Sequence, residues 1–214
     1  MTGKQASVDN PVFARVWTFL TRHEPAAVRA LRQQNLAGLT GRVLEVGAGT
    51  GTNFMLYPES VGEVVALEPE SRLADVARET AAGAPVPVTV TECTIEALPP
   101  DDEFDAVVCS LVLCSVDDPD TVLRQLLARL RPGGQLRYLE HVASPGLRGR
   151  LQRLADATVW PRIAGNCHTH RDTERRIAAA GFTPQTARHE LLFPSWVPVP
   201  VSEVALGEAI RPAA

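Results

Sequence analysis

The fold is decided by residues 43–51, which read VLEVGAGTG. The first four form a short apolar run around one glutamate, Glu45, and three of the next five are the glycines Gly47, Gly49 and Gly51. Glycine accepts tight turns and close approach of a ligand to the backbone, because it has no side chain. A helix expected after the loop would present free N–H groups to that ligand. The stretch therefore predicts a ligand-binding loop at the end of a strand.

Strands and helices alternate along the chain beyond this loop. Further strands are expected at 64–67, 86–90, 105–113 and 136–142, and helices at 71–82, 121–130, 144–163 and 172–180. Two late strands, at 185–191 and 202–210, would form an antiparallel hairpin at the sheet edge. This pattern predicts a Rossmann-like α/β fold, in which helices cover both faces of a doubly wound, mostly parallel sheet.

The first 40 residues are expected to be helical. Apolar residues recur at helical spacing around residues 13–20, and a second helix is expected over 25–36. We therefore divide the chain into an N-terminal helical segment or lid, 1–40, and one α/β domain, 41–214. The aromatic residues Phe13, Trp17 and Phe19 either pack this segment onto the sheet or cover an apolar acceptor, and both roles are compatible.

Composition narrows the class of protein. The 214 residues include 21 basic and 25 acidic side chains, which argues against a nucleic-acid-binding protein. The single lysine, Lys4, excludes an internal Schiff base and the lysine of a P-loop. Residues 1–10 are polar and no apolar run approaches about 20 residues, so we expect a cytoplasmic protein without a membrane anchor. The four cysteines lack C-x-x-C spacing, which indicates buried free thiols. No pattern indicates an oligomeric state.

Spacing restricts what the glycine loop binds. A dinucleotide fingerprint, G-x-G-x-x-G, would need a third glycine where Thr52 stands, and the Gly-Lys-Ser/Thr of a P-loop is absent. Glu68 ends the second strand, 17 residues beyond Gly51. A carboxylate at that place accepts the hydroxyls of a ribose in dinucleotide-binding folds. Glu70, its neighbour, is expected on the surface.

These motifs carry a family resemblance. The run LEVGAGTG at 44–51 resembles the first motif of class I S-adenosylmethionine-dependent methyltransferases, and ALEP at 66–69 resembles the second. IEALP at 95–99 with FDAVV at 104–108 resembles the third and fourth, and LRPGG at 130–134 resembles the turn before the fifth strand. The ordered set covers about 100 residues.

Within that superfamily the chain is similar to the methyltransferase-like 7 group, the alkyl thiol methyltransferases. The matching stretches are GTGTNF at 49–54, YP at 57–58, VVCSLVLCSV at 107–116 and EHV at 140–142. A looser match comprises Asp156, Trp160, Cys167, Thr169 and Arg171. Animal members carry an N-terminal hydrophobic membrane anchor, and we expect none here.

The resemblance implies S-adenosylmethionine as cofactor and assigns residues to it. Gly47, Gly49 and Gly51 would hold the methionine part, with Glu45 near its amino group or orienting the loop. Glu68 would bind the ribose. Thr94 and Ile95 would lie beside the adenine. Ser110 and Leu111 would lie on the reacting side.

Two residues are candidates for the catalytic chemistry. His141 follows the fifth strand and is the first candidate for a base; the alternative is that it caps the strand or bonds a loop carbonyl. Asp156 with Trp160 one turn later would present a carboxylate beside an aromatic wall, or would lie on an exposed helix face. The run CHTH at 167–170 does not close a tetrahedral zinc site by itself, so we expect no metal.

The sequence therefore predicts a methyltransferase that acts on a small molecule, with thiol S-methylation preferred. O-, N- or C-methylation of a small metabolite, a quinone or a lipid head group is the alternative. A nicotinamide-dependent oxidoreductase and a cofactor-binding protein without catalysis rank below both.

Overall fold

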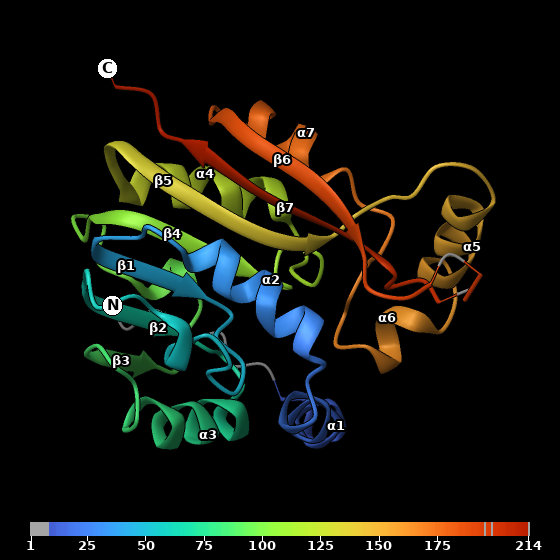
Figure 1. The fold of residues 1–214 in the computed structure, drawn as a ribbon, viewed down its shortest axis with the longest axis horizontal. Coiled ribbons are helices and arrows are strands. Elements are labelled where there is room, and N and C mark those ends of the chain that lie inside the picture. Colours follow the sequence, from blue (N-terminus) through green and yellow to red (C-terminus); the bar gives the residue numbers. More distant parts are fainter. Residues whose placement is uncertain (1–8, 195, 198, 214) are drawn as a thin grey trace.

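A seven-stranded sheet forms the centre of the molecule (Figure 1). The computed structural model describes residues 9–194, 196–197 and 199–213. Across the sheet the strands follow the order β3-β2-β1-β4-β5-β7-β6. Their bounds are β1 Gly41–Val46, β2 Val61–Leu67, β3 Val88–Thr91, β4 Phe104–Ser110, β5 Leu130–His141, β6 Thr183–Leu191 and β7 Glu203–Ile210.

The first five strands are parallel, and β7 runs antiparallel to both of its neighbours, β5 and β6. The helices are α1 Pro11–Arg22, α2 Ala26–Leu36, α3 Ser71–Ala81, α4 Pro119–Arg129, α5 Gly146–Asp156, α6 Trp160–Ile163 and α7 Thr173–Ala179. The predicted fold class, including the antiparallel edge hairpin, is confirmed. Within the described part of the chain, no helix is long and apolar enough to cross a membrane.

Two apolar cores lie on opposite faces of the sheet. Side chains of α4 and α7, such as Leu126 and Ile177, pack on one face, and side chains of α2 and α3, such as Leu36 and Ala77, pack on the other. Figure 1 shows α2 in front of the sheet and α4 and α7 behind it. Strands buried on both faces read as nearly continuous apolar runs, which explains why they were visible in the sequence.

Four local expectations are wrong. The strand predicted over 105–113 ends at Ser110, because Leu111 adopts a positive φ of 62°. The helix predicted over 144–163 is two helices, α5 and α6. A short 3-10 helix, Phe54–Leu56, follows the glycine loop where an α-helix was expected. Glu70, expected on the surface, is buried and accepts a hydrogen bond from the backbone N–H of Leu73 as the N-cap of α3.

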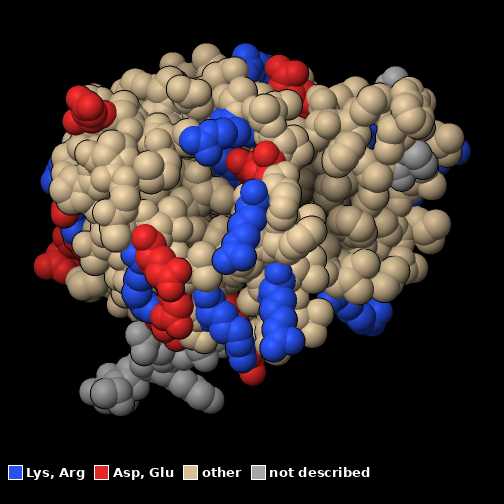
Figure 2. Space-filling view, turned by 60° about the horizontal axis from the view of Figure 1, so that its bottom comes forward, with Lys and Arg blue, Asp and Glu red and all other residues tan. Residues whose placement is uncertain are grey.

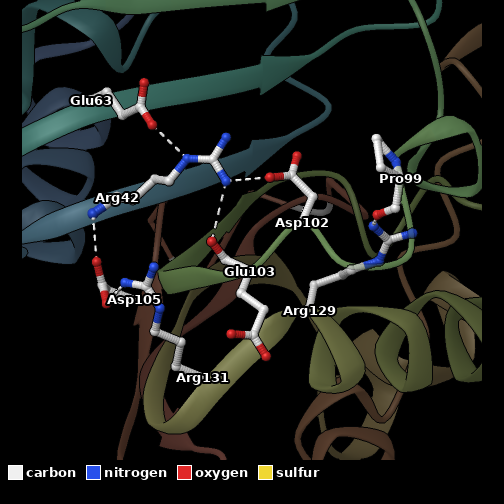
Figure 3. Close-up of polar contacts among 8 residues, drawn as sticks. All are labelled: Arg42, Glu63, Pro99, Asp102, Glu103, Asp105, Arg129 and Arg131. Atoms are coloured by element: carbon white, nitrogen blue, oxygen red, sulfur yellow. Dashed lines mark hydrogen bonds and ion pairs between the residues drawn. The ribbon is translucent and has the colours of Figure 1, made fainter.

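An arginine network closes the amino end of the sheet, opposite the loops described below (Figure 3). The guanidinium of Arg42 in β1 pairs with Glu63 of β2 and with Asp102 before β4, and it lies 4.5 Å from the centre of the Phe104 ring. The backbone N–H of Arg42 donates to Asp105, which also pairs with Arg131. These contacts fix β1, β2 and β4 against one another without occupying the carboxyl end of the sheet.

Gln152 of α5 ties together the segments that follow the last parallel strand. Its side chain is fully buried and accepts a hydrogen bond from the backbone N–H of Ser144 at 2.7 Å. Its amide nitrogen donates to the carbonyls of Val142, Thr169 and Pro200 at 3.0–3.2 Å. One side chain therefore joins α5 to the segment after β5, the segment before α7 and the segment before β7.

We expect Gln152→Ala to lower the free energy of unfolding by about 2–4 kcal/mol, because it leaves several buried backbone groups without a partner. Chemical denaturation measures the change. The matched control, Gln33→Ala on the exposed face of α2, should shift stability by no more than about 0.5 kcal/mol. Equal effects of the two substitutions would contradict a special role for Gln152.

Candidate active site

The loops predicted to bind a ligand converge on one edge of the sheet. The strand order reverses between β1 and β4, and in open α/β sheets the crevice at such a switch point, beyond the carboxyl ends of the strands, is the usual binding site. The predicted residues lie within the last residues of β1 to β4 or just beyond them, in this order: Glu45, Gly47, Gly49 and Gly51; Glu68; Thr94 and Ile95; Ser110 and Leu111. Their individual roles stay predictions.

The glycine loop is packed too closely for side chains. Gly47, Gly49 and Gly51 have φ angles of 64°, 58° and 77°, in the left-handed region that glycine accepts. A Cβ atom on Gly47 would lie 2.4 Å from the Val112 side chain, and one on Gly49 would lie 2.9 Å from the indole nitrogen of Trp17. The loop is therefore enclosed between α1 and the segment after β4.

Glu68 joins the glycine loop to the start of α3. One of its carboxylate oxygens accepts a hydrogen bond from the N–H of Gly49 at 2.8 Å, and the other accepts one from Glu70 at 3.0 Å. Burial raises the pKa of the Glu68 carboxyl, while these two backbone bonds oppose the rise. The carboxylate thus stands at the carboxyl end of β2, in contact with the loop that the sequence assigned to the same ligand.

A buried chain of hydrogen bonds runs from Glu45 to the end of β4. Tyr57 donates to Glu45 Oε2 at 2.7 Å, and Asn53 Nδ2 donates to Glu45 Oε1 at 2.9 Å and to Ser110 Oγ at 3.2 Å. Arg32 of α2 donates to Asn53 Oδ1 at 3.2 Å. Both oxygens of Glu45 therefore accept bonds from residues that follow the glycine loop, an arrangement that orients this loop.

Sequence reasoning gave no role to Arg32, Asn53 or Tyr57. Asn53 and Tyr57 lie within the stretch that carries the family resemblance, which was the one available signal. Arg32 had none, because a buried arginine on a helix of mixed composition looks like any surface arginine until its partners are known.

Helix α1 covers the glycine loop with two aromatic rings. Phe13 stacks on Trp17, with centroids 5.6 Å apart, and Trp17 lies against Gly49. A Cβ on Gly165 would lie 2.4 Å from the Phe13 ring. The pair therefore extends from the glycine loop to the loop before α7. Phe19 points elsewhere and is exposed. A lid function of residues 1–40 stays a prediction that these contacts favour.

His141, the candidate base, is the last residue of β5 and faces two thiols. Its Nδ1 lies 3.6 Å from Cys114 Sγ and 3.5 Å from Cys167 Sγ. The hydrogen-bonded contact with Cys167, together with burial, holds the pKa of the Cys114 thiol well above its usual value. His141 therefore lies at the expected edge of the sheet, but its Nδ1 faces sulfur instead of a loop carbonyl.

Asp156, the second candidate, ends α5 and holds a loop. One carboxylate oxygen accepts hydrogen bonds from the N–H and hydroxyl of Thr169 at 2.9 and 3.1 Å, and the other accepts one from the N–H of His170 at 2.9 Å. These contacts assign Asp156 to positioning the segment around residue 169. A direct part in catalysis stays a prediction.

Comparisons with known proteins agree with this geometry. A family described as a methyltransferase domain matches residues 20–187. The chain is 36% identical over 187 residues to the mouse protein named thiol S-methyltransferase TMT1B, covering 83% of this chain and 75% of that one. The structure is similar to a SAM-dependent methyltransferase from Methanosarcina mazei, with a TM-score of 0.65, 18% identity, and 85% and 97% of the two chains covered.

A second solved structure is similar over most of its length. It is the N-methyltransferase NodS from Bradyrhizobium japonicum in complex with S-adenosyl-L-homocysteine, with a TM-score of 0.64 and 17% identity. The match covers 95% of this chain and 89% of that one. At such identities the two structures establish the fold.

The buried carboxyl of Glu45 makes stability depend on pH. Burial raises its pKa to about 7, although the bonds from Tyr57 and Asn53 and the charge of Arg32 act in the opposite direction. The folded state therefore holds this proton more tightly than the unfolded chain, in which the pKa is about 4.5. Its contribution to stability is fully present below about pH 4.5 and is lost as the pH rises to about 7.

We expect Glu45→Gln to remove roughly 3 kcal/mol of the change in unfolding free energy between those pH values. Denaturation curves of wild type and variant across this range measure it. Glu59→Gln, at an exposed position, serves as control and should follow the wild-type profile. Parallel pH profiles of wild type and Glu45→Gln would show that folding leaves the pKa of Glu45 unchanged.

Proposed function

Because the chain belongs to the family of S-adenosylmethionine-dependent methyltransferases, we propose that it transfers a methyl group to a small-molecule thiol. The observation that carries the thiol is the 36% identity, over 83% of this chain, to a protein named as a thiol S-methyltransferase. That similarity extends beyond the cofactor loops to the segments around His141 and Cys167, where the acceptor is expected.

The residues at the carboxyl edge fit the cofactor. The left-handed glycine loop brings backbone close to the ligand, and Glu68 offers carboxylate oxygens for ribose hydroxyls. The hydrogen bonds among Glu45, Asn53 and Ser110 connect this loop to the reacting side. S-adenosylmethionine, when bound, supplies a methyl group on a positively charged sulfonium.

Apolar side chains are exposed on the elements that follow β5. Five exposed apolar side chains lie along α5 and α6 and the turn between them: Leu147, Leu151, Leu154, Val159 and Ile163. The same two helices also carry the arginines Arg148, Arg150, Arg153 and Arg162, so their outer surface is apolar and basic, and the part of it seen in Figure 2 is mostly uncharged. Phe13 and Trp17 add an aromatic surface between the glycine loop and Gly165. We therefore propose short alkyl and aryl thiols as the substrate class.

Acceptor chemistry is tested with molecules that differ in one atom. S-adenosylhomocysteine formation from S-adenosylmethionine should occur with hexanethiol and thiophenol, and not with hexanol, hexylamine or phenol. Turnover confined to an alcohol, amine, phenol or quinol would agree with a methyltransferase but would reject a thiol as its acceptor. Absence of turnover with every acceptor, although the cofactor binds, would reject the proposed substrate class.

Cofactor binding is tested at Glu68. We expect Glu68→Ala to weaken binding of S-adenosylhomocysteine by roughly 10- to 100-fold, because hydrogen bonds to a charged group contribute about 1.5–3 kcal/mol. Isothermal titration calorimetry measures the affinity, and circular dichroism confirms that the variant folds. Glu59→Ala, at an exposed position on a different loop, is the control. Unchanged affinity would reject the ribose assignment.

A further inference from the structure

Three potential metal ligands meet beside the acceptor side of the site. Cys114 comes from the segment after β4, His141 from the end of β5 and Cys167 from the loop before α7. We call them the Cys2His cluster. Their exposed fractions are 1%, 8% and 6%, so all three are buried. Sequence reasoning expected no metal because residues 167–170 cannot close a site alone and no spaced partner motif is present; Cys114 and His141 lie 53 and 26 residues before Cys167 and form no such motif.

The separations within the cluster are those of a tetrahedral zinc site. The two sulfurs are 3.7 Å apart, and His141 Nδ1 lies 3.6 Å from Cys114 Sγ and 3.5 Å from Cys167 Sγ. With Zn–S bonds of about 2.3 Å and a Zn–N bond of about 2.0–2.1 Å, tetrahedral angles require roughly 3.8 Å between sulfurs and 3.6 Å between sulfur and nitrogen. The three separations are therefore those that a single tetrahedral ion requires.

The two cysteine-bearing segments are fastened to each other by hydrogen bonds. The N–H of His168 donates to the carbonyl of Cys114, and the side chain of Asn166 donates to the carbonyl of Ser115, both at 2.7 Å. Arg171 donates to the carbonyls of Leu113 and Val116 at 2.6 and 2.8 Å. Such outer contacts hold metal ligands in place before the ion arrives.

The charges of the Cys2His cluster also match those of a zinc ion. Two thiolates would neutralise the charge of Zn²⁺, and the guanidinium of Arg171 binds carbonyls on either side of Cys114. Nitrogen and sulfur ligands are the donor set that zinc prefers over the oxygen-seeking Mg²⁺ and Ca²⁺.

The cluster supplies three of the four ligands of a tetrahedral ion. Among the described residues, no fourth cysteine, histidine or carboxylate joins these three within 4.8 Å. Structural zinc sites are closed by four protein ligands, whereas sites with three bind water or substrate in the fourth position. Cys114 lies four residues after Ser110, at the reacting side, and Gly165 beneath the Phe13 ring is two residues before Cys167.

We propose that Cys114, His141 and Cys167 bind one zinc ion, and that its fourth position takes the sulfur of the acceptor. Binding releases the thiol proton to solvent and forms a zinc thiolate. The thiolate sulfur then forms a bond to the methyl carbon while the carbon–sulfonium bond breaks, and its electron pair stays on S-adenosylhomocysteine. Metal binding stands by itself, whereas the acceptor's part rests on the proposed function.

Metal binding is tested with Co²⁺ as a spectroscopic probe on the full chain, reduced and stripped with a chelator. One equivalent should give the thiolate-to-cobalt charge-transfer band and the intense visible bands of tetrahedral cobalt, and Zn²⁺ should abolish both. Cys167→Ser should weaken binding by more than the roughly 10- to 100-fold that loss of an outer-shell contact costs. Cys93→Ser, a buried cysteine outside the cluster, should bind as wild type does.

Two results would overturn the metal site. One is an absence of these bands in the reduced wild type. Formation of a Cys114–Cys167 disulfide in air would then indicate that the two cysteines form a redox pair instead. The other is equal binding by wild type and Cys167→Ser. Zinc K-edge absorption of the loaded wild type, which needs no variant, should show two sulfurs and one imidazole nitrogen besides the exogenous ligand; a different ligand set rejects the cluster.

The open position is tested on the cobalt-loaded protein without methyl donor. Hexanethiol should shift the visible bands and hexanol should not; no shift with the thiol would reject acceptor coordination. The proposed function can fail separately. If the metal site responds to thiol but no thiol yields S-adenosylhomocysteine, the proposed methyl transfer is rejected and the metal site is kept. If the metal-free protein methylates thiols at the full rate, the proposed function stands and the role of a zinc thiolate is rejected.

Discussion

One buried carboxylate sets the course of the chain on the reacting side of the sheet. Glu140, the next-to-last residue of β5, is fully buried and accepts hydrogen bonds from three successive backbone N–H groups, those of Val112, Leu113 and Cys114, at 3.0–3.1 Å. Burial raises the pKa of this carboxyl, and the three backbone bonds act against the rise. A strand extended to residue 113 would need those N–H groups for its neighbours, so the strand ends at Ser110.

The segment that Glu140 holds separates two functional neighbourhoods. On one side Val112 packs against Gly47 of the cofactor loop, and on the other Cys114 faces His141 and Cys167. A shift of one residue in this segment therefore changes the contacts of both the cofactor loop and the Cys2His cluster. Since adjacent residues of β5 supply Glu140 and His141, the sheet itself fixes the distance between the loop and the cluster.

Structural elements and binding residues could be predicted where residues that are neighbours in the sequence form a recognisable pattern. The parallel strands are apolar runs, the glycine loop has its own spacing, and Glu68 stands at a fixed place after a strand, so these were predicted at the correct edge. The polar contacts that join distant segments have no such pattern. Glu45 meets Asn53 and Tyr57, and Cys114 meets His141 and Cys167, only because the fold brings their segments together. The N-cap role of Glu70 was missed because its burial depends on Arg72 and the start of α3.

The environment also discriminates between acceptor atoms. A thiolate and a sulfonium carry opposite charges that disappear as the methyl group moves, so a site that excludes water favours the reaction because neither charge is well solvated. A neutral amine acceptor would instead keep the positive charge and would benefit from a carboxylate beside it. Two carboxylates, Glu140 and Asp156, do stand near this side of the site. The oxygens of Glu140 accept hydrogen bonds from backbone N–H groups, and those of Asp156 accept them from Thr169 and His170, so neither is directed at an acceptor. The described surroundings thus favour an acceptor that reacts as an anion and leaves as a neutral thioether.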